Sequence, residues 1–433
     1  MPITSEFGNE NQMNPGYRIG IISTRLAGTD GVSLETAKWV KVLESLGYEC
    51  FYFAGESDWP ADHTYLLPEA HFEHSEINEL NHDLFDDYQR LQKTSSSINR
   101  LKLHIKSHLH KFINNFSPDI LIAENILSIP MNIPLGLALT EVIVESDLPT
   151  IGDHHDFYWE RERFSISGAE DYLRAAFPPT LRQIRHVVIN SYAQSQLAMR
   201  TGINSTLIPN VMEFRRPLPV IDDFSSDLRE ELGISQDECL LLQPTRIVPR
   251  KRIELSLELA RRIDKNCVVL ISHRSGDEGN AYESHLRKFA DLLNVRVIFG
   301  GDRFDYYRGQ AQNGQKIFSL EDAYLQADLV TYPSRVEGFG NAFLETIYYK
   351  RPIVMSTYEI FKTDIQPKGF KVIGFGDFID NRCIAAAREI LSNPQQAKEM
   401  TEINFSIGKR NYSFDTLEFL LMPLLNECLG KQD

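Results

Sequence analysis

Two glutamates flank a glycine-rich stretch in the C-terminal half of the chain. The stretch Tyr332-Pro-Ser-Arg-Val-Glu-Gly-Phe-Gly-Asn-Ala-Phe-Leu-Glu345 directly follows an apolar run typical of a buried strand. Gly338 and Gly340 allow the backbone to approach a ligand closely, and free N–H groups at the start of the next helix favour an anion. Glu345 lies about two turns into that helix, where it can reach a ligand hydroxyl. An ordinary strand–loop–helix turn with a solvated Glu345 also fits, but the whole string favours a ligand site.

A basic cluster follows an earlier apolar run. In Gln243-Pro-Thr-Arg-Ile-Val-Pro-Arg-Lys-Arg252, a proline-containing turn separates Arg246 from Lys251. Both side chains can converge on a diphosphate, where cations stabilise the charge that develops on a leaving group. A basic cluster before a helix is as often a solvated face, so the residues alone leave both interpretations open.

Two loops in the N-terminal half carry further candidates. Gly28 and Gly31, in Ala27–Ser33, permit a backbone cradle for phosphate or acceptor, although such spacing is commonly just a turn. The stretch Gly152-Asp-His-His-Asp-Phe-Tyr-Trp-Glu-Arg161 places two histidines at the end of a predicted strand. These residues could instead cap the strand end and pair with Arg161 or Arg163, but the density of Asp, His and aromatic residues favours a role on the acceptor side.

Short apolar runs alternate with amphipathic stretches, a pattern typical of βαβ units around a parallel sheet. We expect a first series of strands at Tyr17–Ser23, Tyr48–Ala54, Asp119–Glu124, Pro149–Asp153 and Val187–Ser191, and a second at Cys239–Gln243, Cys267–Ser272, Arg296–Gly300, Leu329–Pro333 and Pro352–Ser356. Expected helices include Ser33–Leu46, Leu135–Ser146, Ile253–Ile263, Glu283–Leu293 and Phe414–Leu429. Two serial blocks predict an α/β protein with two doubly wound domains joined within Pro209–Ser226, and ligands at the carboxyl ends of the strands.

A polar, histidine-rich insert spans about Glu56–Ser117. His104 and His108 share one face of a predicted helix, a spacing that can hold a transition metal. The flanking Lys102, Lys106 and Lys111 would oppose a cation, so a solvated helix face is the better interpretation.

The composition excludes several classes of protein. The 433 residues carry a net charge of −15, which disfavours nucleic acid and anionic membranes as partners. The five scattered cysteines are typical of free thiols in a reducing compartment. The segment Met1–Gly16 does not resemble a signal peptide, and no apolar run is long enough to span a bilayer. We therefore expect a soluble, cytoplasmic protein.

Taken together, the paired glutamates and the basic cluster resemble the retaining glycosyltransferases of family GT4, which have the two-domain GT-B fold. The stretches Val188-Ile-Asn-Ser191 and Leu207-Ile-Pro-Asn-Val211 also resemble that family. The resemblance covers nearly the whole chain except Glu56–Ser117 and Arg303–Lys316. It implies an acceptor-side Rossmann-like domain at 1–215, a donor domain at 216–412 and a helix at 413–433 that returns to the first domain.

The resemblance also assigns roles. Glu337, Gly338, Phe339, Gly340 and Asn341 would hold the donor sugar, and Glu345 the ribose. Arg246 and Lys251 would bind the diphosphate, with Arg250 and Arg252 facing outward. Gly28 and Gly31 would lie on the donor side. His155 with Asp156 matches the family's His–Asp pair best, with His154 as the alternative. The implied catalytic residues are Glu337, His155, Arg246 and Lys251.

The implied reaction is metal- and cofactor-independent transfer of a hexose from a UDP-, GDP- or ADP-sugar to a hydroxyl of a sugar or other small acceptor, with retention of configuration. Backbone atoms near Phe299–Arg303 would recognise the base. Two alternatives stay open: a disaccharide phosphorylase on the same scaffold, and a non-catalytic protein that binds sugar nucleotides. A sugar-nucleotide epimerase shares the fold but usually lacks the paired-glutamate string.

Overall fold

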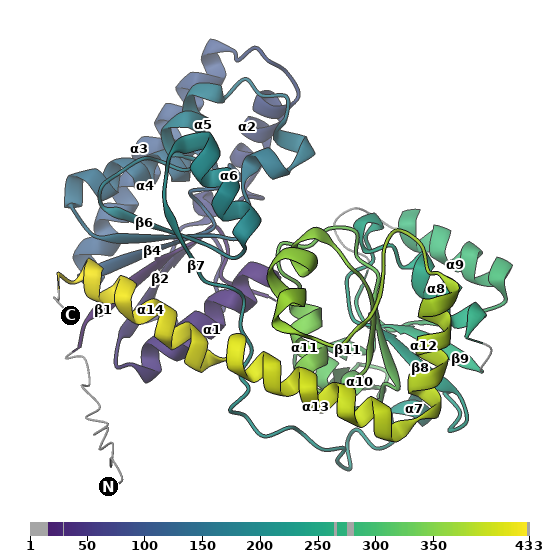
Figure 1. Cartoon of the computed structure of the whole chain (residues 1–433). Coiled ribbons are helices and arrows are strands. Elements are labelled where there is room, and N and C mark those ends of the chain that lie inside the picture. The colour runs from purple at the N-terminus through teal and green to yellow at the C-terminus, as the bar shows by residue number, and fades with distance from the viewer. Residues whose placement is uncertain (1–15, 29, 264–265, 275–280, 431–433) are drawn as a thin grey trace, which may run out of the picture. The chain divides into compact units, whose positions relative to one another are not determined.

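The computed structural model describes residues 16–28, 30–263, 266–274 and 281–430, and the chain divides into two compact units. Unit 1 comprises Met1–Val188, Ala193–Ile208 and Leu417–Asp433, and unit 2 comprises Ile189–Tyr192 and Pro209–Thr416. Each unit is built on a parallel sheet with helices on its faces (Figure 1), which confirms the predicted fold class of two doubly wound Rossmann-like domains. The expectation about a signal peptide concerns residues 1–15, which lie outside the described part of the chain.

In the described residues of unit 1, seven parallel strands form a sheet in the order β3-β2-β1-β4-β5-β6-β7. The strands are β1 (Arg18–Ile22), β2 (Glu49–Ala54), β3 (Thr64–Leu66), β4 (Ile120–Glu124), β5 (Thr150–His154), β6 (Ile184–Val188) and β7 (Ser205–Leu207). The helices are α1 (Gly31–Ser45), α2 (Ser75–Phe85), α3 (Gln92–Phe116), α4 (Ile133–Ser146), α5 (Glu170–Ala176), α6 (Ser191–Thr201) and α14 (Phe414–Cys428), with short 3₁₀ turns η1 (Pro68–Ala70), η2 (Tyr158–Glu160) and η3 (Glu162–Phe164).

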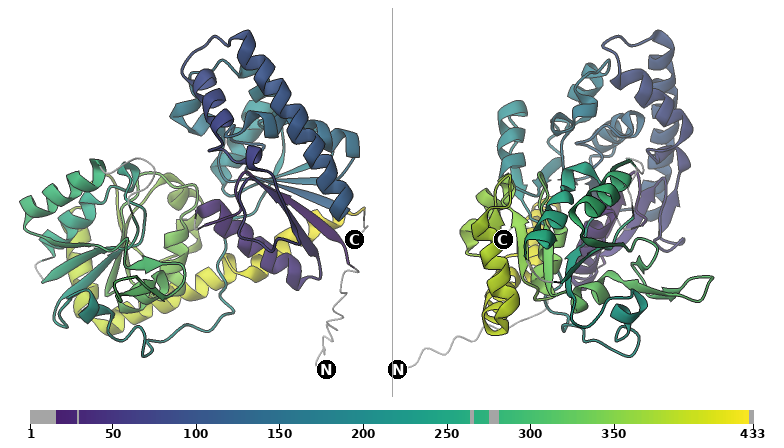
Figure 2. Two further views of the ribbon diagram at one scale, coloured as in Figure 1. Left: turned by 180° about the vertical axis from the view of Figure 1, so that it is seen from behind. Right: turned by 90° about the vertical axis from the view of Figure 1, so that its right-hand side faces the viewer.

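The alternation of side chains along the strands divides the apolar core of unit 1 between the two faces of its sheet. Ile22, Phe53 and Leu121 pack with apolar residues of α3 and α4 on one face. Both α1 and α14 lie on the other face (Figures 1 and 2). α14 begins in unit 2 and belongs to unit 1 from Leu417 onward.

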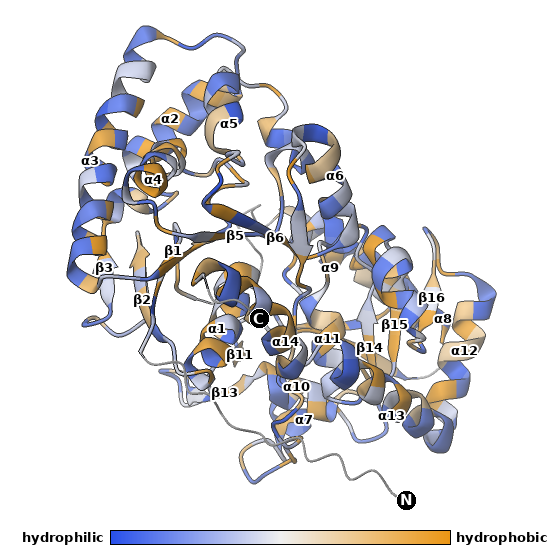
Figure 3. Ribbon diagram, turned by 60° about the vertical axis from the view of Figure 1, so that its left-hand side comes forward, coloured by the Kyte–Doolittle hydropathy of each residue, from blue (hydrophilic) through white to orange (hydrophobic). Residues whose placement is uncertain are grey.

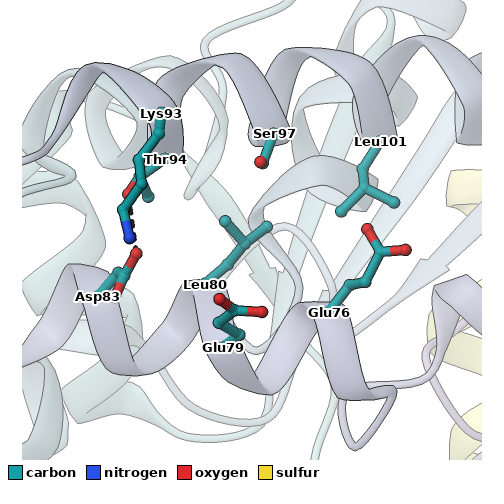
Figure 4. A pocket seen from close by; sticks show the side chains of 8 residues that line it. All are labelled: Glu76, Glu79, Leu80, Asp83, Lys93, Thr94, Ser97 and Leu101. Carbon is teal, nitrogen blue, oxygen red and sulfur yellow. Dashed lines mark hydrogen bonds between the residues drawn. The ribbon is translucent and has the colours of Figure 1, made fainter.

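The insert predicted at Glu56–Ser117 contains α2 and α3, but it begins with a strand that the sequence did not suggest. β3 pairs in parallel with β2 and extends the edge of the sheet. Figure 4 shows a pocket of about 70 Å³ between α2 and α3, lined by polar side chains that include Glu76, Asp83 and Lys93. Its volume is far below that of a typical small-molecule site, so this pocket is too small for a sugar nucleotide.

In the described residues of unit 2, six parallel strands form a sheet in the order β10-β9-β8-β14-β15-β16. These strands are β8 (Cys239–Gln243), β9 (Cys267–Ile271), β10 (Arg296–Phe299), β14 (Leu329–Tyr332), β15 (Ile353–Ser356) and β16 (Ile373–Phe375). The helices are α7 (Leu228–Glu231), α8 (Glu254–Arg262), α9 (Ala281–Leu293), α10 (Leu320–Gln326), α11 (Asn341–Tyr348), α12 (Asn381–Ser392) and α13 (Pro394–Asn411), with the shorter turns η4 (Pro249–Lys251), η5 (Phe361–Ile365) and η6 (Gln366–Lys368).

The sheet of unit 2 is also covered on both faces. Leu240 and Leu242 belong to the core beneath α10 and α11, whereas Leu241, which lies between them, belongs to the core beneath α8, α9 and α12. Strands β14 and β15 are therefore buried throughout. The surface helix α3 in unit 1 instead alternates between polar and apolar residues (Figure 3).

One prediction about a strand needs correction, and one further segment contains strands that were not predicted. The strand expected at Val187–Ser191 runs instead over Ile184–Val188, and Ser191 is the first residue of α6. The polar residues Arg185 and His186 interrupt the apolar pattern at the start of β6, so the sequence did not indicate where the strand begins. His186 is nevertheless buried against His154 of β5. In the segment of weak resemblance near Arg303–Lys316, the described chain forms a small sheet of β11 (Phe304–Asp305), β13 (Lys316–Ser319) and β12 (Gly309–Gln310).

Within the described residues, no helix is long and apolar enough to cross a bilayer. The cysteines of this part of the chain are free thiols.

Candidate active site

Gly340 makes possible the turn between β14 and α11. It adopts φ +117° at the N-cap of α11, a conformation that glycine alone tolerates without strain. A Cβ atom there would lie 2.6 Å from the hydroxyl of Tyr358, which donates a 2.6 Å hydrogen bond to the carbonyl of Phe339. The carbonyl of Gly338 accepts a 2.7 Å hydrogen bond from Asn190 Nδ2. These contacts hold the loop through its carbonyls, and the N–H groups at the very start of α11 suit an anion.

Two asparagines that the sequence analysis did not assign to the site hold this loop. Asn190 binds the Gly338 carbonyl, and Asn210 Nδ2 donates a 2.7 Å hydrogen bond to Asn341 Oδ1. Both lie in the stretches that resemble the family, each just after an apolar run. For Asn190, which follows the buried end of β6, an asparagine at the end of a buried strand was the signal available. The ring of Phe339 is buried against Tyr412, so only the backbone of Phe339 can contact a ligand.

Glu337 forms a buried ion pair with the basic cluster. Its Oε1 contacts Lys251 Nζ, and its Oε2 lies 3.3 Å from Arg250 Nη1. Burial by itself would raise the pKa of Glu337, but the charges of Lys251 and Arg250 outweigh it and lower the pKa below the usual value. Glu337 is therefore an ionised carboxylate that only accepts hydrogen bonds. The expectation that Arg250 faces outward is wrong, because its guanidinium contacts the Glu337 carboxylate, as the Lys251 ammonium does.

The structure separates the two predicted diphosphate ligands by environment. Lys251 is buried, 5.4 Å above the ring of Tyr332, and this burial lowers its pKa. Arg246 is exposed, and within the described part of the chain its guanidinium forms no ion pair. Burial lowers the pKa of His273, which follows β9, to about 4, and the charges of Lys251 and Arg246 add to this shift. This neutral histidine was not predicted, because a single histidine after a strand carries no distinctive pattern.

Glu345 lies apart from the cationic cluster. It is half-buried on α11, and its Oε2 accepts a 2.9 Å hydrogen bond from the hydroxyl of Tyr324 on α10. Tyr324 in turn stacks on Tyr349 at a centroid distance of 4.8 Å. Burial and the Glu345 charge raise the pKa of Tyr324, so the phenol stays protonated and orients the carboxylate. A fixed carboxylate of this kind can accept hydrogen bonds from a diol.

In unit 1, the glycine loop lies at the start of α1. Gly28 adopts φ +75°, and its N–H donates a 2.8 Å hydrogen bond to Asp58 Oδ2. Gly31 is the first residue of α1, which Asp30 caps by accepting hydrogen bonds from Val32 and Ser33. The amide of Gly28 is thus already bound by Asp58 in this structure, and the amides of Val32 and Ser33 are bound by Asp30.

The predicted histidine pair divides between two environments. His155 Nε2 lies 2.8 Å from Glu124 Oε1 and 3.6 Å from Asp153 Oδ2, at the carboxyl ends of β4 and β5. Burial favours the neutral ring, but the two carboxylates raise the pKa of His155 well above its usual value. Burial and Asp153 also raise the pKa of Glu124 to about 7. The ligand atoms of these three residues lie within 4.8 Å of one another, so they are also the side chains that could hold a metal ion.

The alternative histidine is part of the core. His154 is fully buried, and its Nε2 lies 2.8 Å from His186 Nδ1. Burial and the neighbouring histidines lower the pKa of His154 well below its usual value. Asp156 forms an ion pair with Arg161 and accepts a 3.2 Å hydrogen bond from Asn125 Nδ2, as the strand-capping interpretation anticipated.

Comparisons with known proteins identify the family of the chain. The model of the family "Glycosyl transferases group 1" matches residues 224–405. The chain is 32% identical over 439 residues to a mannosylglucosylglycerate synthase from Thermotoga maritima (93% of this chain, 98% of the relative) and 31% identical over 428 residues to one from Petrotoga mobilis (90% and 97%). The fold is similar to that of sucrose-phosphate synthase from Thermosynechococcus elongatus, with a TM-score of 0.66 and 14% identity over 96% of this chain and 99% of that one.

Proposed function

Because the chain belongs to the glycosyl transferases group 1 and is a glycosyltransferase, we propose that it transfers a hexose from a nucleotide diphosphate sugar to a carbohydrate hydroxyl with retention of configuration. The observation that carries this proposal is the buried contact between Glu337 and Lys251 beside the first turn of α11. The contact joins two loops of unit 2, so a carboxylate that could accept from sugar hydroxyls lies beside an ammonium that could donate to phosphate.

In this proposal, different residues of unit 2 bind the diphosphate, the sugar and the ribose of the donor. Lys251 and Arg246 neutralise the diphosphate as the glycosidic bond breaks, and the amides at the start of α11 bind the same negative charge. Glu337 accepts hydrogen bonds from the sugar because its pKa is lowered and it stays ionised. Glu345, oriented by Tyr324, accepts from the ribose diol. No metal or cofactor enters this scheme, since cationic side chains and amides supply the stabilisation.

The relatives suggest the substrates. Both are named as synthases of mannosylglucosylglycerate, a product that contains mannosyl, glucosyl and glycerate parts. One transfer completes such a product if a mannosyl group from a nucleotide diphosphate mannose is added to glucosylglycerate. We take glucosylglycerate as the acceptor and UDP, GDP or ADP as the nucleotide. The acceptor is an anion, so a chain of net charge −15 must bind it through local cations.

A thermal-shift screen with UDP-, GDP- and ADP-mannose tests the donor half of the proposal. A donor at about 100 times its Kd stabilises the native state by about 2.7 kcal/mol, a shift of several degrees. Glu345→Gln should reduce the shift, whereas Glu359→Gln, which changes an exposed carboxylate of the same unit, should preserve it. Stabilisation by inorganic phosphate but not by any nucleotide would favour the phosphorylase. Nucleotide-sugar binding without transfer to any acceptor would favour the non-catalytic alternative.

A further inference from the structure

Arg163 is a cation without a carboxylate partner in the loop that follows β5. Its Nη2 contacts Sδ of Met131, in the loop after β4, and its guanidinium carbon lies 4.4 Å from the centroid of the Phe164 ring. In the described part of the chain, Nε and Nη1 of Arg163 make no hydrogen bond. A thioether and an aromatic face contact the guanidinium without neutralising it, so the cation is available to an anion.

The carboxylates beside Arg163 do not supply that anion. Asp156 forms an ion pair with Arg161, and Glu160 Oε2 accepts a 2.8 Å hydrogen bond from a backbone N–H at the start of η2. Glu162 is exposed and, among the described residues, forms no ion pair with Arg163. Partial burial of the guanidinium lowers the pKa of Arg163, and the charge of Arg161 adds to this shift. Arg163 nevertheless stays charged at neutral pH, because arginine keeps its proton in proteins.

The insert helix α2 supports both side chains that contact the guanidinium. Phe164 is buried and packs edge-on against Phe85 of α2, with 4.7 Å between the ring centroids. The carbonyl of Met131 accepts a 2.9 Å hydrogen bond from Asn81 Nδ2, also on α2. The loops after β4 and β5 are thus held together where they meet at Arg163. Ligands of doubly wound domains bind at these carboxyl ends, so Arg163 lies on the ligand side of unit 1.

In the described part of unit 1, one other arginine, Arg200, has no carboxylate partner. Arg200 donates a 3.0 Å hydrogen bond to Gln196 on the same helix, α6, and does not contact the loop after β4. We propose that Arg163 binds the carboxylate of the acceptor through parallel N–H bonds and thereby selects an anionic glucoside over a neutral one. This inference rests on the proposed function, in which the acceptor is glucosylglycerate.

Specificity for the acceptor tests the assignment. Glucosylglycerol is the neutral analogue of glucosylglycerate, with a hydroxymethyl group in place of the carboxylate. In the wild type, the KM for glucosylglycerol should exceed the KM for glucosylglycerate at least about tenfold. Arg163→Gln should raise the KM for glucosylglycerate by a similar factor and leave the KM for glucosylglycerol and for the nucleotide sugar unchanged. The kcat should change little, because the carboxylate takes no part in the reaction and is bound equally before and during transfer.

Two further variants separate contact with the carboxylate from a general effect of charge. Arg200→Gln removes one positive charge from the same unit and should leave both KM values unchanged. Arg163→Lys keeps the charge but loses the planar fork, so its KM for glucosylglycerate should lie between those of the wild type and Arg163→Gln. A KM for glucosylglycerate that rises in Arg200→Gln and not in Arg163→Gln would overturn the proposal.

Failure of this inference can be distinguished from failure of the proposed function. If the wild type transfers a hexose to both acceptors with equal KM, the inference is wrong and the proposed function stands. If no nucleotide sugar supports transfer, the proposed function fails, and calorimetric titration of the wild type and Arg163→Gln with the two glucosides replaces the kinetics. A loss of affinity for glucosylglycerate of about tenfold or more in Arg163→Gln would then support the carboxylate contact. Equal affinities of the two proteins would overturn it.

Discussion

Replacing Gly340 by alanine perturbs the donor loop without touching any charge. The residue has φ +117°, outside the regions that alanine occupies comfortably. The new Cβ atom would also lie 2.6 Å from Tyr358 Oη and 3.1 Å from Tyr332 Oη. Both groups are buried, so the hydroxyl of Tyr358 must move and its hydrogen bond to the Phe339 carbonyl must lengthen or break.

The loss of stability in Gly340→Ala has two sources, the backbone strain and the displaced Tyr358 hydroxyl. Backbone strain costs roughly 1–3 kcal/mol, and loss of the Tyr358–Phe339 hydrogen bond adds about 1 kcal/mol. We expect Gly340→Ala to destabilise unit 2 by about 3 kcal/mol, which lowers the unfolding midpoint by roughly 10 °C for a unit of this size. Gly233→Ala is the matched control in the same unit. Its φ is +66°, but the nearest atom, Arg296 Nη2, lies 3.7 Å away, so strain alone should cost about 1 kcal/mol.

The assay can distinguish the two units. The three tryptophans, Trp39, Trp59 and Trp159, all lie in unit 1, so their fluorescence follows that unit, whereas far-UV circular dichroism follows both. Gly340→Ala should shift the dichroism transition in urea and weaken nucleotide-sugar binding at least about tenfold, or about 1.4 kcal/mol. Equal destabilisation by Gly340→Ala and Gly233→Ala would refute the packing argument. Unchanged donor affinity would remove this loop from the donor site.

Three other predictions concern charges and hydrogen bonds. Lys251→Met leaves Glu337 buried with only Arg250 as a cationic partner, so the free energy of unfolding in urea at pH 8 should fall by about 3 kcal/mol. The loss should be smaller at pH 5, where the carboxylate can be protonated. An equal loss at both pH values would contradict this prediction. Tyr324→Phe removes the hydrogen bond to Glu345 and should weaken nucleotide binding in calorimetry by about 1 kcal/mol, without affecting binding of free pyrophosphate. Burial lowers the pKa of His186 to about 4, below its unfolded value. Tryptophan-monitored stability of unit 1 should therefore be complete above pH 6.5 and fall by up to about 3 kcal/mol as the pH approaches 4, and His186→Leu should flatten that decline.

The sequence predicted most of the fold because both sheets are buried on two faces. Their strands are short, continuous apolar runs between helices, so β8, β9 and β14 were found at or within a residue of their observed bounds. The prediction failed where a strand carries polar residues. β6 contains His186, which is buried only because His154 on the neighbouring strand offers it a partner, and such a pairing cannot be seen in either strand alone.

The site was predictable where one segment carries the chemistry and not where distant segments meet. The paired glutamates could be recognised within a single loop. The partners of Glu337 and Gly338 come from segments about 86 and 148 residues away, Lys251 and Asn190. The same reason explains the error about Arg250, whose direction depends on the 3₁₀ turn η4 and on where Glu337 lies. Likewise, the contact of Glu124 with His155 exists only because β4 and β5 are adjacent in the sheet.

The proposed transfer of a hexose from a nucleotide diphosphate sugar with retention of configuration can be tested directly. The most direct measurement follows the early time course of reactions with UDP-, GDP- and ADP-mannose and glucosylglycerate by ¹H NMR, with EDTA present. We expect one nucleotide to support formation of a mannosylated product whose new anomeric centre has the configuration of the donor, and Glu337→Gln to abolish it while Glu359→Gln does not. A product of inverted configuration, transfer that requires an added metal, or transfer that survives Glu337→Gln would contradict the account.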